Sequence, residues 1–206
     1  EQSALLKEAG MIAASQLEKP AVSIEIFEAL RGLVPEDESV LDALESLYAR
    51  VEDWSSLVDL LSTKIEREES LDGRKALAYQ RAGIYENEIE SVEQAIEAYI
   101  QVLDWDAEDL ESLRQLDALY TKQGEWLDLL QILDRLRPLG SESEAADLQF
   151  RIGKIWEGEL ESTPEAIQAY SALLDTNPED ERGIAALEAI VVEKDERESA
   201  FDVLVP

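Results

Sequence analysis

The chain has 206 residues, of which 45% are hydrophobic and 32% charged, a composition typical of a folded protein rather than a disordered one. Acidic residues outnumber basic ones by 48 to 18, and the resulting net charge of −30 is expected to repel nucleic acid and anionic lipid surfaces. Cysteine and histidine are both absent, which excludes disulfides, thiolate nucleophiles, structural zinc sites and the commonest general base.

Twelve helical segments are predicted along the chain, because apolar residues recur at helical spacing and strand-like alternation is nearly absent. Ala95, Ala98, Tyr99 and Val102 are one example. The segments run approximately over residues 3–18, 20–32, 37–51, 53–68, 72–90, 92–104, 108–122, 124–136, 142–161, 163–175, 179–193 and 195–204.

Prolines and glycines mark the connections between these segments. Pro35, Pro164 and Pro178 stand at helix starts or connections, and Gly124 and Gly140 stand in turns. The connections are therefore short, which favours antiparallel helical hairpins.

The segments repeat with a period of 71 to 72 residues. Residues 46–61 align with residues 118–133, and residues 94–109 align with residues 165–180. The pairs that coincide are Leu47 and Leu119, Tyr48 and Tyr120, Trp54 and Trp126, Ala95 and Ala166, Tyr99 and Tyr170, and Leu103 and Leu174. Residues 23–37 form an earlier copy, in which Phe27 takes the tyrosine position.

A period of this length with four helices corresponds to two hairpins of roughly 36 residues, so three super-repeats fill the chain. Their hairpins are predicted at about 1–36 and 37–71, 72–107 and 108–140, and 141–178 and 179–206. We expect one domain over residues 1–206. Because the first residue is Glu1 rather than methionine, we also expect a longer chain or a processed leader.

These residues resemble the tetratricopeptide repeat family. A unit opened at Ala76 puts Gly83 at the family's small position and Tyr99 at its aromatic one, and Pro178 matches the terminal proline. Relative to the family's pattern, one residue is inserted between Gly153 and Ala166. The resemblance implies an all-α, right-handed α-solenoid of about six antiparallel hairpins. Its concave groove, lined by the first helix of each hairpin, would bind a peptide or helix of a partner protein.

Scarce basic residues fall at positions expected to face this groove. They are Arg81, Arg114, Lys122, Arg151 and Lys154. One hypothesis is a cationic strip that engages acidic side chains of a partner. The alternative is that these residues only offset acidic neighbours through helix-surface pairs of a few tenths of a kcal/mol. The neighbours considered are Glu88, Glu111, Asp147 and Glu157.

The tryptophans divide into two groups. Trp54 and Trp126 recur at one repeat position, which indicates packing at the start of a second helix, and Trp156 is interpreted as a plug between hairpins. Trp105 lies in a connection between two aspartates, so we expect a partly exposed ring that serves as an interface anchor.

No constellation for catalysis, metal binding or cofactor binding is found in the sequence, so no enzyme activity and no cofactor is predicted. The leading hypothesis is a non-catalytic protein–protein interaction scaffold. The alternative is a structural protein that self-assembles into a homo-oligomer through its ends or faces. No apolar run approaches the roughly 20 residues of a membrane helix, and no signal peptide is seen, so a soluble protein is expected. Absence of cysteine fits both cytoplasm and periplasm, and no compartment is predicted.

Overall fold

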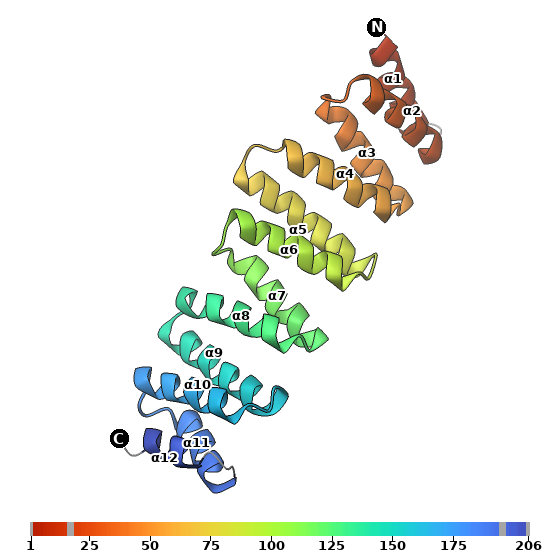
Figure 1. Ribbon diagram of the computed structural model, residues 1–206. Coiled ribbons are helices and arrows are strands. Elements are labelled where there is room, and N and C mark those ends of the chain that lie inside the picture. Colours follow the sequence, from red (N-terminus) through yellow and green to blue (C-terminus); the bar gives the residue numbers. More distant parts are fainter. Residues whose placement is uncertain (1, 16–18, 194–196, 205–206) are drawn as a thin grey trace. The chain divides into compact units, whose positions relative to one another are not determined.

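The structure is a computed structural model that describes residues 2–15, 19–193 and 197–204. Its helices group into two compact units, which meet in sequence between Trp105 and Asp106. These described ranges contain twelve α-helices and no β-strand (Figure 1). The prediction of an all-α fold is confirmed, whereas the single domain over 1–206 stays a prediction.

Unit 1 consists of three antiparallel hairpins (Figure 1). Its helices are α1 (Gln2–Ser15), α2 (Pro20–Leu33), α3 (Glu38–Val51), α4 (Trp54–Arg67), α5 (Leu71–Asn87) and α6 (Val92–Trp105). The partners in each hairpin contact one another, and α2 packs on α3 and α4 on α5. The predicted boundaries agree to within about three residues, and the predicted end of the first helix at 16–18 lies outside the described residues.

Unit 2 repeats this order with two irregular turns. Its elements are α7 (Leu110–Gln123), α8 (Trp126–Leu136), the 3₁₀ turn η1 (Arg137–Leu139), α9 (Glu142–Lys154), the π-helical turn η2 (Ile155–Glu159), α10 (Thr163–Thr176), α11 (Glu181–Glu193) and α12 (Arg197–Leu204). The prediction of one helix over 142–161 is therefore corrected to an α-helix followed by a π turn. The predicted start of the last helix at 195–196 lies outside the described residues.

The connections reproduce the super-repeat in their hydrogen bonds. The turns after α3 and α7 place Glu52 and Gly124 in the left-handed region, with φ of 57° and 73°. In each turn the next backbone N–H donates to a tyrosine carbonyl at 3.0 Å, that of Tyr48 or Tyr120. Both helices thus end in the same C-terminal cap.

The turns after α5 and η2 form a second matching set. The N–H of Ile89 donates to the carbonyl of Ile84 at 3.0 Å, and Leu160 donates to Ile155 at the same distance. Each turn then passes through a glutamate in the left-handed region, Glu90 with φ of 57° and Glu161 with φ of 51°. Residues 71 apart in sequence therefore share a backbone conformation as well as a side-chain pattern.

Aspartates cap the second hairpin of each super-repeat. Asp37, Asp109 and Asp180 precede α3, α7 and α11, and each accepts a hydrogen bond from a backbone N–H in the first turn. These bonds satisfy donors that the helix start leaves open. Hydrogen bonds from Ser39 and Lys7 lower the pKa of Asp37, and those from Arg182 lower the pKa of Asp180.

Small residues on first helices allow aromatic rings to approach. A Cβ added to Gly10 would lie 2.7 Å from the ring of Phe27, whereas Gly83 has open space around it. Ala82 is fully buried and stands 72 residues after Gly10 and 71 before Gly153. Ala82 rather than Gly83 is therefore the small residue of its hairpin, and the insertion inferred before Ala166 is not needed.

Candidate functional site

Side chains link consecutive first helices within unit 1. Arg50 of α3 donates to the carbonyl of Ala14 in α1 at 2.9 Å, and Gln80 of α5 donates to Glu45 of α3 at 2.9 Å. The partners are 36 and 35 residues apart, which is the length of one hairpin. These links stabilise the stacking of neighbouring hairpins and occupy polar groups of the first-helix face.

Unit 2 contains the corresponding ion pairs. Arg151 of α9 donates through two nitrogens to the carboxylate of Asp117 in α7, at 2.8 and 2.6 Å, and to the hydroxyl of Thr121 at 2.7 Å. Arg182 of α11 lies 2.6 Å from Asp147 of α9. Arg151, predicted as a partner-binding cation, is thus bound within the unit, as the alternative interpretation proposed, although by an aspartate that the sequence did not indicate.

Arg81 of α5 in unit 1 points to second helices rather than along the first-helix face. Its guanidinium donates to Ser62 in α4 at 3.0 Å and to Gln101 in α6. Its Nε is buried without a hydrogen-bond partner. Burial lowers the pKa of Arg81, because desolvation disfavours the charged form.

Two further predicted residues have partners inside the protein. Lys154 pairs with Glu157 at 2.8 Å, as the alternative interpretation expected. Trp105 ends α6, where its half-buried ring packs against the small core of Ile65, Ala78 and Val102. The guanidinium of Arg74 lies 5.5 Å from the ring centroid, a cation–π contact that the sequence did not reveal.

Arg114 stands in a groove of about 250 Å³ between α7 and α9. The lining residues are Leu110, Arg114, Asp117, Leu136, Leu139, Gly140, Glu144, Asp147 and Leu148. Within the described part of the chain, the exposed side chain of Arg114 makes no hydrogen bond or ion pair, and neither does that of Lys122, two turns further along α7.

The three carboxylates of this groove are engaged elsewhere. Asp117 and Asp147 hold the arginines of the next first helices. Glu144 completes a capping box with Ser141, whose backbone N–H donates to it at 2.8 Å and lowers its pKa. The charge of Arg114 also lowers the pKa of Glu144, but its guanidinium makes no hydrogen bond within the described residues, so its N–H groups remain open to a ligand.

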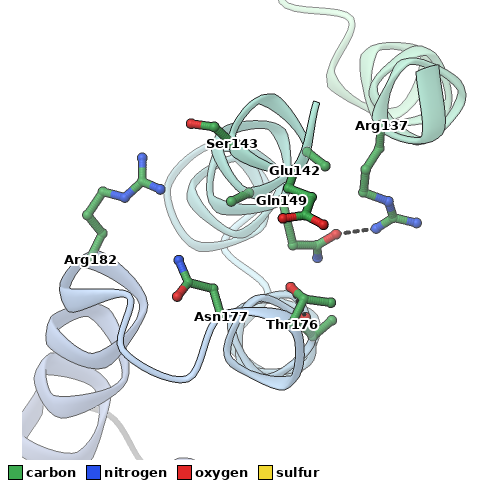
Figure 2. Close-up of a pocket in the computed structure, with 10 residues that line it drawn as sticks. Arg137, Glu142, Ser143, Gln149, Thr176, Asn177 and Arg182 are labelled. Carbon is green, nitrogen blue, oxygen red and sulfur yellow. Dashed lines mark hydrogen bonds between the residues drawn. The ribbon is translucent and has the colours of Figure 1, made fainter. Parts of the chain in front are cut away.

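A larger cleft of about 790 Å³ opens on another side of α9 (Figure 2). Its lining comes from η1, the first turns of α9, the end of α10 and the start of α11. The residues are Arg137, Glu142, Ser143, Ala145, Ala146, Gln149, Ala172, Thr176, Asn177 and Arg182. The sequence did not indicate this cleft. Its only sequence signal is the group of alanines, which is common in helices.

Both arginines of the cleft are held by internal partners. Arg137 donates to the side chain of Gln149 (Figure 2). It also lies 3.4 Å from Asp134. Arg182 lies 2.8 Å from Asp180, and its hydrogen bonds to Asp180 and Asp147 raise its pKa. The cleft is consequently lined by fixed, largely neutralised arginines.

Neither a metal-ligand cluster nor a membrane-length apolar helix occurs among the residues that the structure describes. No protein-family model matches the sequence. A comparison with curated proteins gives no match either.

Solved structures that match are tetratricopeptide repeat proteins, the family that the sequence resembles. One, from Parabacteroides merdae, is 16% identical, with 98% of this chain and 84% of that chain covered and a TM-score of 0.45. YrrB, described as a TPR protein with an unusual peptide-binding site, is 13% identical, with 87% and 88% covered and a TM-score of 0.42. The C-terminal part of a protein from Cytophaga hutchinsonii is 14% identical, with 97% and 78% covered and a TM-score of 0.44. The helical-hairpin fold of this chain is established by its own helices.

Proposed function

We propose that the chain is a non-catalytic scaffold that binds a peptide or helix of another protein on the first-helix face of unit 2. The observation that carries the proposal is Arg114, an exposed cation that makes no hydrogen bond or ion pair within the described residues, in a groove that four leucines also line. Lys122 extends the same side of α7. No reaction is proposed, since the sequence contains neither histidine nor cysteine.

The charge balance selects the kind of peptide. A polyacidic partner would be repelled by the net charge of −30, whereas a single carboxylate can pair with Arg114. An exposed pair of this kind contributes about 0.2–1 kcal/mol, and burying an apolar side chain contributes about 1.5–3 kcal/mol. An apolar residue in the groove would therefore supply most of the affinity, and Arg114 would set its orientation.

Phage-displayed random 12-residue peptides panned against the immobilised chain would test this function. The enriched peptides should combine apolar residues with one carboxylate, and Arg114→Glu should weaken their binding at least about twofold in fluorescence anisotropy, since it replaces an exposed ion pair by a repulsion of similar size. Arg31→Glu in α2 is the matched control, because it makes the same change in net charge in unit 1. Enriched peptides that bind Arg114→Glu and wild type equally would refute the proposed site.

Self-assembly is the second candidate, and exposed apolar side chains favour it. Leu5 on α1 is 68% exposed, Val192 on α11 76% and Phe201 on α12 52%. The charges of α1 cancel, since it carries Lys7 and Glu8, so repulsion is weak there. Light scattering during size-exclusion chromatography, over a range of protein concentration and salt, should show masses in multiples of 23.1 kDa. A constant monomer mass would exclude this candidate.

A further inference from the structure

The cleft of Figure 2 has a volume of about 790 Å³. Three of its lining residues have small side chains, namely Ala145 and Ala146 of α9 and Ala172 of α10. This volume lies within the range of roughly 300–1,000 Å³ that is usual for ligand sites in proteins. The cleft is separate from the Arg114 groove, with which it shares no lining residue.

Gln149 makes one wall of the cleft rigid. It is only 7% exposed, and its amide donates to the backbone carbonyl of Ala169 at 3.0 Å while its oxygen accepts from Arg137. These bonds fix the side chains of both Gln149 and Arg137 before any ligand arrives. A fixed wall reduces the entropy lost on binding.

The charges around the cleft do not favour an anion. Arg137 is paired with Asp134, and Arg182 with two aspartates. The carboxylate of Glu142 also points into the opening (Figure 2). A free phosphate or carboxylate would therefore meet compensated arginines and an additional negative charge.

Hydrogen-bonding groups of both polarities remain on facing walls. Within the described residues, the side chains of Glu142 and Ser143 on α9 and of Asn177 after α10 make no hydrogen bond or ion pair. The carboxylate accepts, whereas the hydroxyl and the amide both donate and accept. Arg137 retains N–H groups beyond those that contact Gln149 and Asp134.

We propose that this cleft binds an extended, uncharged peptide segment of a partner through its main chain. A peptide backbone presents one N–H and one C=O per residue, which matches walls that both donate and accept. The side-chain amide of Asn177 can pair with one peptide group in both directions. The alanines that line the cleft leave room for the peptide backbone to approach. The inference is independent of Arg114.

Nuclear magnetic resonance can test the site with a defined probe, the tripeptide N-acetyl-Ala-Ala-Ala-N-methylamide. Titration into the isotopically labelled chain should shift the side-chain amide signals of Asn177 and Gln149 in a saturable manner. Acetate serves as the anionic comparator and should leave these signals unchanged. A response to acetate alone, or no saturable response to the tripeptide, would overturn the proposal.

Two variants locate the binding. Ala146→Leu places a large side chain in the cleft and should weaken binding of the tripeptide at least tenfold. Ala118→Leu, on the exposed side of α7, should not change the affinity. Asn177→Asp keeps the shape but removes the donors, and should weaken binding at least fivefold. Asn177→Asp tests the site on its own if the Ala146→Leu protein fails to fold. Wild-type affinity in a folded Ala146→Leu protein, or in Asn177→Asp, would contradict the site.

Discussion

Gly153 in α9 faces the ring of Tyr170 in α10 so closely that a Cβ on residue 153 would lie 2.3 Å from the ring. Tyr170 is fully buried, and its hydroxyl donates to Glu157 at 2.8 Å. The ring is thus fixed at both its face and its tip. The contact lies within a hairpin, and it decides how closely the two helices approach.

Gly153→Ala should lower the free energy of unfolding by about 1–3 kcal/mol, because the added methyl must displace a buried ring. Urea denaturation followed by circular dichroism would measure the change.

Gly83→Ala is the matched control, since it makes the same substitution in a helix where open space surrounds the glycine. It should raise the free energy of unfolding by up to about 1 kcal/mol through helix propensity. A Gly153→Ala protein as stable as Gly83→Ala would show that the ring approach is not tight.

Replacement by glycine should raise the free energy of unfolding at each of the three glutamates with positive φ, which are Glu52, Glu90 and Glu161. A residue with a Cβ costs roughly 1 kcal/mol in this conformation, and the corresponding position after α7 is already Gly124. The midpoint temperature of thermal unfolding should therefore be higher for Glu52→Gly than for wild type. Glu52→Gln controls for the lost charge, and an equal shift in both variants would attribute the effect to charge instead of backbone strain.

Substitutions of Arg151 and Arg114 should have different effects on the free energy of unfolding. Arg151→Gln breaks the two-nitrogen contact with Asp117 and should cost at most about 1 kcal/mol, because the pair is partly exposed. Arg114→Gln should cost about 0.3 kcal/mol or less, since it loses only an electrostatic attraction to Glu144 and no hydrogen bond or ion pair. A larger loss for Arg114→Gln in chemical denaturation would mean that it has a structural partner.

Acid should remove the contribution of the capping carboxylate Asp180. Its pKa is lowered in the folded chain, so its stabilisation is present above the unfolded pKa of about 3.9 and is lost as pH falls through the lower folded value. The stability difference between wild type and Asp180→Asn should therefore be largest near neutral pH and shrink below about pH 4. Denaturation curves at several pH values test this, and a difference independent of pH would contradict it.

The helical hairpins could be predicted from the sequence because apolar spacing and turn residues are local signals. Ala95 and Tyr99 mark a buried helix face without any knowledge of what packs on it. The π turn at Ile155–Glu159 was missed because its sequence continues an ordinary helical pattern.

The candidate site was less predictable, because its chemistry depends on contacts between helices. Arg81 and Arg151 were both predicted to face the groove, yet Arg81 points to second helices and Arg151 pairs with Asp117. With Ala82 as the counterpart of Gly153, the residue that corresponds to Arg151 is Gln80, which makes the matching link to Glu45. With 48 acidic residues in the chain, many carboxylates were candidates for each cation. The pairing is decided by side-chain direction, which a small rotation of a helix changes.

The two turns that contain Glu90 and Glu161 have the same backbone hydrogen bonds at positions 71 residues apart. Each turn could therefore serve as a splice point. Joining residue 90 to residue 162 would remove one block of two hairpins and recreate, at the junction, a turn that the chain already forms. A coding sequence that recombines within itself at these points would lengthen or shorten the protein by whole blocks, so its size can change without a new loop having to evolve.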